Sequence, residues 1–238
     1  METVFITGLS REMGLGTALA RQYLRKGYTV FASCRDVNKD HINQLKTEWK
    51  DSLIPVALDV TSRESVENAA TVIRKHGGLI DILISNATAT NKEGNEPIDA
   101  GCDTEHMLNA YNVNAVGFLR MVQVFLPFFS KGAKVNAITS EAGSMGHCWR
   151  DNGLDYGMAK AALNFACVTL QRRLGKNGIR VLAIHPGWVQ TRPAPPKADL
   201  TPEQSAEYII KTIANPPDYN EKGNTGVFVW YDGRNFVF

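Results

Sequence analysis

Short runs of apolar residues alternate along the chain with longer segments in which apolar residues recur at helical spacing. The short runs, such as VFIT, IDILIS and IRVLAI, are typical of strands that are buried on both faces. They predict strands at Thr3–Thr7, Tyr28–Ser33, Leu53–Leu58, Ile80–Ser85, Lys134–Thr139, Arg180–His185 and Gly226–Tyr231. The longer segments predict helices at Thr17–Lys26, His41–Lys50, Arg63–Lys75, His106–Phe129, Tyr156–Leu174 and Pro202–Ile213.

This alternation predicts an α/β fold, with a parallel sheet, helices on both faces and right-handed crossovers. No Pro/Gly/Ser-rich linker, repeat or low-complexity tract divides the sequence. We therefore expect residues 1–238 to form a single domain, a Rossmann-type doubly wound parallel sheet of about seven strands.

Composition and charge exclude several classes of function. The 44% hydrophobic content can build a core, and a net charge of +2 is too small for a nucleic-acid surface. No apolar run approaches the roughly 18 residues that span a bilayer, and the first residues do not form a signal peptide. The four cysteines have neither disulfide nor zinc-ligand spacing. We expect a cytoplasmic protein without a metal, and no membrane or nucleic-acid partner.

The first predicted strand ends in a glycine-rich turn, TGLSREMGLG, which leads directly into a helix. Glycines there let backbone N–H groups approach a pyrophosphate, and the helix N-terminus adds partial positive charge. A plain tight turn is the alternative, but the position at the first strand–helix junction favours dinucleotide binding.

This turn resembles the TGxxxGxG loop of the classical short-chain dehydrogenases/reductases. Gly27 follows Gly16 by eleven residues, as a glycine before the second strand does in that family, so we match Gly8, Gly14 and Gly16 to its three glycines. The turn is then two residues longer, similar to the loop of the enoyl reductases, and Glu12 should point away from the phosphates. The resemblance implies cofactor contacts from Gly8, Ser10, Arg11, Gly14, Leu15 and Gly16.

The end of the second predicted strand, ASCRD, bears on the choice between NAD and NADP. The resemblance places Cys34 where NAD-preferring members carry an acid for the ribose 2′-OH, and a thiol cannot take that role. Arg35 follows directly and Arg11 lies in the glycine loop, and two guanidinium groups suit a 2′-phosphate. We expect NADP(H); NAD(H) is the less favoured alternative, in which Asp36 pairs with Arg35.

Three further strand ends match the cofactor site of the family. Asp59 and Val60 match the acid and apolar neighbour at the adenine. Asn86 and Ala87 lie where the family usually reads NNAG, although Thr88 replaces the glycine. The segment HPGWVQT resembles the PG segment at the carboxamide, although Pro-Gly alone also marks ordinary turns. It adds the candidate contacts Pro186, Gly187, Val189 and Thr191.

Tyr156 and Lys160 are four residues apart and would project from one helix face. A YxxxK pair alone commonly marks only a helix surface, but further motifs of the family accompany it. Ser140 begins an SxxG motif after the fifth strand, with Ser144 as its alternative, and Asn114 begins an NxxG motif. The resemblance therefore supplies Asn114, Ser140, Tyr156 and Lys160 in the family's order.

The chemistry explains these residue types. Hydride transfer to a carbonyl leaves an alkoxide that must be protonated, and the resemblance assigns this step to Tyr156, whose phenol ordinarily has a pKa of about 10. The Lys160 ammonium would favour the phenolate and hold the nicotinamide ribose, so that both residues contact the cofactor. Ser140 would orient the substrate oxygen, and Asn114 would hold a water that links Lys160 to solvent.

The resemblance covers nearly the whole chain and is closest to the C-factor and carbonyl-reductase-like branch. It implies an NADP(H)-dependent oxidoreductase with a small carbonyl or alcohol substrate. Imine or enone reduction, a non-redox step and a non-catalytic dinucleotide-binding signalling role are the alternatives. At the usual substrate lid the chain reads Arg192-Pro193-Ala194-Pro195-Pro196, where Arg192 either attracts an anionic group or faces solvent.

The predicted helices His106–Phe129 and Tyr156–Leu174 carry more apolar surface than one sheet face can cover. In relatives these two helices form a subunit interface. We therefore expect a homodimer or homotetramer.

Overall fold

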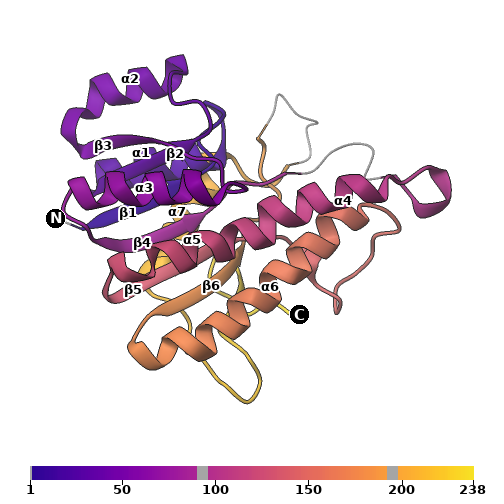
Figure 1. Ribbon diagram of the computed structural model, residues 1–238. Coiled ribbons are helices and arrows are strands. Elements are labelled where there is room, and N and C mark those ends of the chain that lie inside the picture. Colours follow the sequence, from indigo (N-terminus) through magenta and orange to yellow (C-terminus); the bar gives the residue numbers. More distant parts are fainter. Residues whose placement is uncertain (1, 90–95, 192–197) are drawn as a thin grey trace.

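Seven strands form one parallel sheet in the computed structural model, which describes residues 2–89, 96–191 and 198–238. They are β1 (Thr3–Thr7), β2 (Thr29–Cys34), β3 (Leu53–Ala57), β4 (Ile80–Ser85), β5 (Phe129–Ile138), β6 (Arg180–His185) and β7 (Phe228–Trp230). Their order in the sheet is β3-β2-β1-β4-β5-β6-β7 (Figure 1). The predicted doubly wound α/β fold is confirmed.

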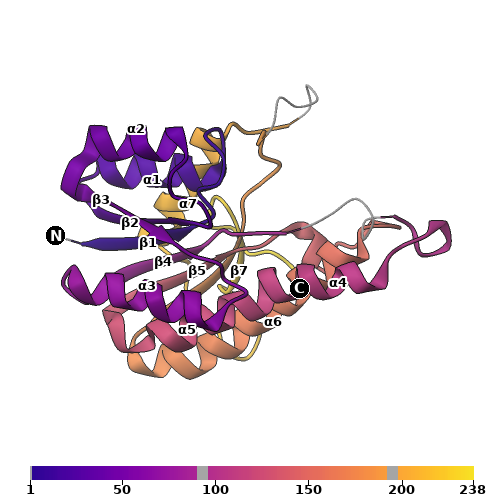
Figure 2. The same cartoon turned by 45° about the horizontal axis from the view of Figure 1, so that its top comes forward.

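Helices cover both faces of the sheet (Figures 1 and 2). One layer contains α1 (Leu15–Arg25), α2 (Asp40–Trp49) and α7 (Pro202–Ala214), and the other contains α3 (Arg63–Lys75), α5 (Gly117–Phe125) and α6 (Leu154–Leu174). In β1, Val4 and Ile6 pack with the first layer and Phe5 with the second, which explains the continuous apolar runs. None of the described helices combines the length and apolarity of a membrane-spanning segment.

The segment predicted as one helix over His106–Phe129 is helical as far as Phe128, but it is not one regular α-helix. α4 (Thr104–Tyr111) leads into a π-helical turn, η4 (Asn112–Val116), before α5 begins, and the chain leaves α5 through the 3-10 turn η5 (Leu126–Phe128). Apolar spacing continues through the π turn, so the pattern alone does not show it. Pro127 lies in η5, where its missing N–H and its ring oppose further α-helix, and β5 follows at once.

The strand order reverses between β1 and β4, which are neighbours in the sheet although α1, β2, α2, β3 and α3 separate them along the chain. The connections that follow these two strands therefore diverge toward opposite halves of the sheet. In open parallel sheets, such a reversal leaves a crevice at the carboxyl ends of the strands where ligands bind.

Candidate cofactor-binding and active site

A cavity of about 480 Å³ lies at this crevice, where β1, β2, β3 and β4 end. Its wall contains the predicted cofactor residues Gly8, Ser10, Arg11, Gly14, Leu15, Arg35, Asp59, Val60, Asn86, Ala87 and Thr191. The other predicted site residues, which lie outside this wall, are Gly16, Asn114, Ser140, Tyr156, Lys160, Pro186, Gly187 and Val189. Apart from Thr191, the predicted residues of this wall are those that would hold the adenine, its ribose and the phosphates.

The glycine loop leaves no room for side chains at two of its glycines. A Cβ on Gly8, whose φ is +82°, would lie 2.8 Å from Nδ2 of Asn86 and 2.9 Å from the amide nitrogen of Ala87. A Cβ on Gly16 would lie 2.7 Å from the same Nδ2 and 2.9 Å from the Gly8 oxygen. The start of α1 therefore lies directly against the loop, and its first amide groups can hold a phosphate there. Glu12 is exposed and is absent from the cavity wall.

Asn86 and Thr7 join the two sides of the crevice. The side-chain amide of Asn86 donates from Nδ2 to the backbone carbonyl oxygen of Thr7 at 2.9 Å. The backbone N–H groups of Asn86 and Ala87 donate to the side-chain hydroxyl oxygen of Thr7 at 2.9 Å each. The side chain of Thr7 thus binds two amides that would otherwise lack partners at the end of β4. The phosphate loop and the end of β4 are held together as one rigid wall.

Three cations lie around the end of β2. Arg35 and Arg11 are exposed side chains in the cavity wall. Lys39, which the sequence analysis missed, donates from Nζ to the Ser10 oxygen at 2.8 Å and brings a third positive charge to the glycine loop. Asp36 instead accepts from the Asn38 amide at 3.0 Å, and among the described residues it forms no ion pair with Arg35. The carboxylate of Asp36 therefore stabilises a local turn.

Asp59 lies farther along the same wall. Its Oδ1 accepts from the Thr61 hydroxyl at 2.7 Å and from the Thr61 amide at 2.9 Å. The Thr61 hydroxyl is the main cause of a pKa below the usual value for Asp59, and the charges of Arg35 and Arg120 act in the same direction. Asp59 is thus an ionised, fixed acceptor at neutral pH.

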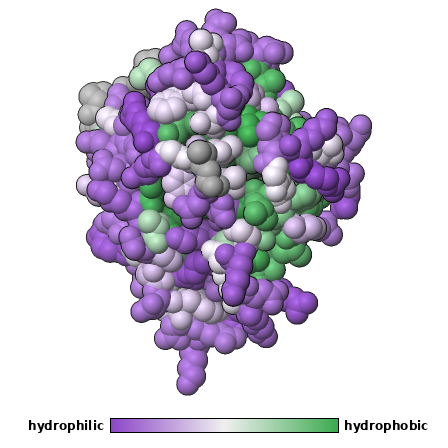
Figure 3. All heavy atoms as spheres, turned by 90° about the vertical axis from the view of Figure 1, so that its left-hand side faces the viewer, coloured by the Kyte–Doolittle hydropathy of each residue, from purple (hydrophilic) through white to green (hydrophobic). Residues whose placement is uncertain are grey.

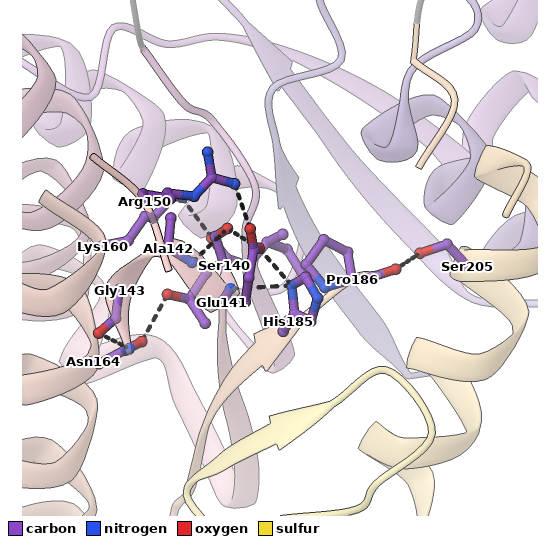
Figure 4. A network of polar contacts seen from close by, with 12 residues as sticks. Ser140, Glu141, Ala142, Gly143, Arg150, Lys160, Asn164, His185, Pro186 and Ser205 are labelled. Atoms are coloured by element: carbon purple, nitrogen blue, oxygen red, sulfur yellow. Dashed lines mark hydrogen bonds and ion pairs between the residues drawn. The ribbon is translucent and has the colours of Figure 1, made fainter. Parts of the chain in front are cut away.

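The loop after β5 brings Ser140 to the amino end of α6, which carries Tyr156 and Lys160. This loop contains the 3-10 turn η6 (Glu141–Gly143), and a Cβ on Gly143 would lie only 2.6 Å from the Lys160 carbonyl carbon. Asn164 of α6 donates to the Gly143 oxygen at 3.1 Å (Figure 4). The glycine of the SxxG motif therefore lets the loop lie directly against the helix.

Tyr156 and Lys160 are close to each other and to Ser140. Lys160 Nζ lies 5.4 Å from the centre of the Tyr156 ring, and the Ser140 hydroxyl interacts with the phenol and lowers its pKa. Burial raises the pKa of Tyr156 to about 12 and lowers the pKa of Lys160 to about 7. Lys160 Nζ also donates to the Ile138 oxygen at 2.8 Å. Without a bound ligand, Tyr156 is therefore a protonated phenol at neutral pH.

Asn114 lies in the π turn and is buried. Its Nδ2 donates to the oxygens of Ala89 and Ala110 at 2.8 Å each, and its Oδ1 accepts from Thr88 Oγ1 at 2.7 Å. Both amide hydrogens are thus used within the protein. A water held for Lys160 would have to use the remaining lone pair of Oδ1 or the backbone of the π turn.

The predicted carboxamide segment follows β6. Ser205 of α7 donates to the Pro186 oxygen at 2.7 Å (Figure 4), and Gly187 has φ +81°. Val189 forms an isolated bridge with Leu200, outside the strands of the sheet, so the chain beyond the predicted lid returns to the segment that follows β6. The lid residues from Arg192 to Pro196 lie outside the described residues, so the two interpretations of Arg192 stay predictions.

Two observations change how the residues near Ser140 are interpreted. Ser144, the alternative to Ser140, donates its hydroxyl to the Val237 oxygen at 2.6 Å and accepts from the His147 amide at 3.1 Å. Its hydroxyl therefore holds the C-terminal segment against this loop. The sequence analysis also missed Glu141, which contacts Ser140, Arg150 and His185 (Figure 4). A charged residue directly after the SxxG serine was the available signal.

Comparison with known proteins extends these observations. Residues 8–237 match the family described as enoyl-(acyl carrier protein) reductase. An uncharacterized oxidoreductase of Schizosaccharomyces pombe is 33% identical in an alignment that covers 98% of this chain and 97% of the relative. A short-chain dehydrogenase of Penicillium crustosum is 34% identical, with 93% of this chain and 78% of the relative covered. The crystal structure of NADPH-bound carbonyl reductase from chicken fatty liver superposes with a TM-score of 0.86 and 27% identity, covering 100% of this chain and 99% of that one.

Proposed function

Because the chain belongs to the short-chain dehydrogenase/reductase family of oxidoreductases, we propose that it transfers a hydride between NADP(H) and a small carbonyl or secondary alcohol substrate, with Tyr156 as the acid/base. The observation that carries this proposal is that Lys160 and Ser140 both lie beside the phenol ring of Tyr156. We also propose that the whole chain works as one cofactor-binding domain.

When bound, the nicotinamide supplies or accepts the hydride, which no side chain can do. The amides around Gly8 and Gly14 hold the pyrophosphate, and Asp59 accepts from the adenine. Pro186, Gly187, Val189 and Thr191 serve the carboxamide end.

Tyr156 donates its phenolic proton to the substrate oxygen as negative charge develops there. Ser140 orients that oxygen. Lys160 binds the nicotinamide ribose hydroxyls, and its charge stabilises the phenolate that Tyr156 leaves behind. Asn114 secures the π turn against the end of β4 and thereby positions the floor of the site.

Replacement of Tyr156 by Phe tests the reaction. We expect NADPH-dependent reduction across a panel of aldehydes and ketones to fall by about 10²–10⁴-fold, the usual contribution of a positioned acid/base. NADPH affinity, measured by calorimetry, should stay close to that of the wild type. Tyr208→Phe is the matched control, since Tyr208 is 43% exposed on α7 and is not one of the predicted site residues. Undiminished turnover in Tyr156→Phe would refute the proposed role.

NADP(H) is the proposed cofactor because Arg11, Arg35 and Lys39 surround the end of β2 while Asp36 is engaged elsewhere. The carbonyl reductase of chicken fatty liver was crystallised with NADPH, which supports the same choice. Arg35→Ala should weaken NADPH binding by roughly 10-fold or more, the loss of one charge-assisted contact, and leave NADH binding unchanged. Arg63→Ala, at an exposed ion pair with Glu67 on α3, is the control. Equal or tighter binding of NADH by the wild type would contradict the choice.

Reduction of a C=C bond conjugated to a carbonyl is the second candidate. The matched family carries the enoyl reductase description, and the glycine loop is two residues longer than TGxxxGxG. Turnover of an enone such as cyclohexenone, without turnover of cyclohexanone, would favour it. Tight NADPH binding without turnover of either compound would favour a dinucleotide-binding signalling role.

We further propose a homo-oligomer that pairs through α5 and α6. A groove along these helices is lined by apolar and polar residues: Val116, Leu119, Val122, Leu126, Leu170 and Leu174, together with Arg63, Arg120, Gln123 and Arg173. Hydrophobic atoms gather on this side of the molecule, at the right of Figure 3. On α6, Leu163 is buried in the core while Phe165 is 74% exposed, so both sides of the helix are apolar. Light scattering should give a dimer or tetramer that Phe165→Glu dissociates; a monomeric wild type would contradict the proposal.

A further inference from the structure

Glu141 connects the serine of the active site to a charged cluster (Figure 4). Its Oε2 accepts from the Ser140 hydroxyl at 2.6 Å, within the range of a charge-assisted O–H···O⁻ bond. Its Oε1 pairs with Arg150, which comes from the segment before α6. Oε2 also lies 3.7 Å from His185 Nδ1. One carboxylate thus contacts residues from three separate parts of the chain.

The hydroxyl of Ser140 has a single proton, and without a bound substrate it donates that proton to Glu141. The same oxygen accepts from the Ala142 amide at 3.2 Å. Ser140 also interacts with the Tyr156 phenol and lowers its pKa. Ser140 therefore lies between the Tyr156 phenol and the Glu141 carboxylate, which is paired with Arg150.

Glu141 is ionised in this arrangement. Burial alone would raise its pKa, but hydrogen bonds from Ser140 and Arg150 outweigh burial and leave the pKa below the usual value. His185 adds no charge at neutral pH, because burial lowers its pKa and its Nδ1 accepts from the Glu141 amide at 3.3 Å. The carboxylate is therefore a lasting negative charge.

Three charged or titratable groups face Tyr156. Glu141 of η6 opposes the loss of the phenolic proton, whereas Arg150 favours it. Lys160 on the same helix is the third, and its Nζ is 5.4 Å from the ring centre. Because Arg150 is bound to Glu141, the two act on Tyr156 as a pair.

We propose that Glu141 is a positioning residue that orients the Ser140 hydroxyl and places a negative charge beside Tyr156, which opposes loss of the phenolic proton. The catalytic consequence of this inference rests on the proposed function, because only a protonated Tyr156 can donate a proton to the oxygen of a carbonyl that is being reduced. The titration of the phenol itself needs neither substrate nor turnover.

The direct test is the ultraviolet titration of tyrosinate, in which each protein is compared with the same protein carrying Tyr156→Phe, so that the difference isolates Tyr156. Glu141→Gln should lower the titration midpoint by about one pH unit, the effect of removing one neighbouring charge. Glu141→Asp should keep the midpoint of the wild type, because it keeps the charge while losing reach to Ser140. Arg150→Gln should move the midpoint upward or out of the accessible pH range.

Glu67→Gln is the matched control, since Glu67 also pairs with an arginine, at 2.8 Å, but lies on the exposed surface of α3. Thermal unfolding shows whether Glu141→Gln is folded. If that variant does not fold, Arg150→Gln still tests the effect of the Glu141 carboxylate, because it removes the partner of that charge. An unchanged midpoint in folded Glu141→Gln, or equal midpoints in all variants, would overturn the inference.

Kinetics separate this inference from the proposed function. With NADPH and para-nitrobenzaldehyde, the alkaline fall of kcat/KM should begin about one pH unit lower in Glu141→Gln than in the wild type. A wild type that reduces no carbonyl compound would refute the proposed function, while the titration would still decide the role of Glu141. An active wild type with the same pH profile in Glu141→Gln would refute the inference alone.

Discussion

Gly143 determines how close Ser140 comes to Tyr156, and Gly143→Ala tests this. The added Cβ would lie 2.6 Å from the carbonyl carbon of Lys160 and 2.7 Å from the amide nitrogen of Ala161. Both atoms are helix backbone and cannot rotate away. An ordinary contact begins at about 3.5 Å, so the loop must withdraw by roughly 1 Å.

This displacement has two measurable consequences. Misplacement of a reacting group by about 1 Å can cost on the order of 10²-fold in rate, so we expect kcat to fall by about 10- to 100-fold. Crowding of a packed site costs about 1–3 kcal/mol, and the smaller entropy of the unfolded Ala chain offsets part of it. A net loss of about 1–2 kcal/mol corresponds to a decrease in Tm of about 2–8 °C.

The assay combines thermal unfolding, NADPH calorimetry and turnover of the best carbonyl substrate. Cofactor affinity should change little, because the phosphate loop is formed by other strands. Gly223→Ala is the control, since its Cβ would meet only Thr225 Cγ2 at 3.5 Å. Wild-type kcat and Tm in Gly143→Ala would refute the argument that this contact positions Ser140.

Three further predictions concern the cofactor loop, the buried lysine and a helix end. Gly16→Ala should weaken NADPH binding at least tenfold by calorimetry, because its Cβ would lie 2.7 Å from Asn86 Nδ2; unchanged affinity would contradict this. The folded pKa of Lys160 is about 7 against 10.5 normally, so the folded state binds fewer protons between these values and stability rises with pH across that interval. Lys160→Met should therefore raise Tm most near pH 7 and less near pH 10, whereas the same change at exposed Lys211 should show no such trend. Thr201→Ala removes the capping box of α7 and should lower Tm by about 2–4 °C, a loss of about 1 kcal/mol; no change would mean that the cap is dispensable.

The sequence by itself determined the fold and the family, since both depend on local patterns. A strand buried on both faces must be apolar throughout, and each such run that the pattern indicated is a strand of the sheet. The glycine loop and the YxxxK spacing are equally local, and the family prediction that they carried is confirmed. The pattern over His106–Phe129 predicted the helical segment but not the π turn inside it, because a π turn widens the backbone without interrupting the apolar spacing.

Only the tertiary structure decided which side chains meet. Glu141 contacts His185 across 44 residues of sequence, and Lys39 reaches Ser10 across 29. No periodicity records such hydrogen bonds, because each depends on the separate paths of two loops that a sheet brings together. Residue types and spacing determine which groups are available, and the packing of distant segments determines which of these groups meet.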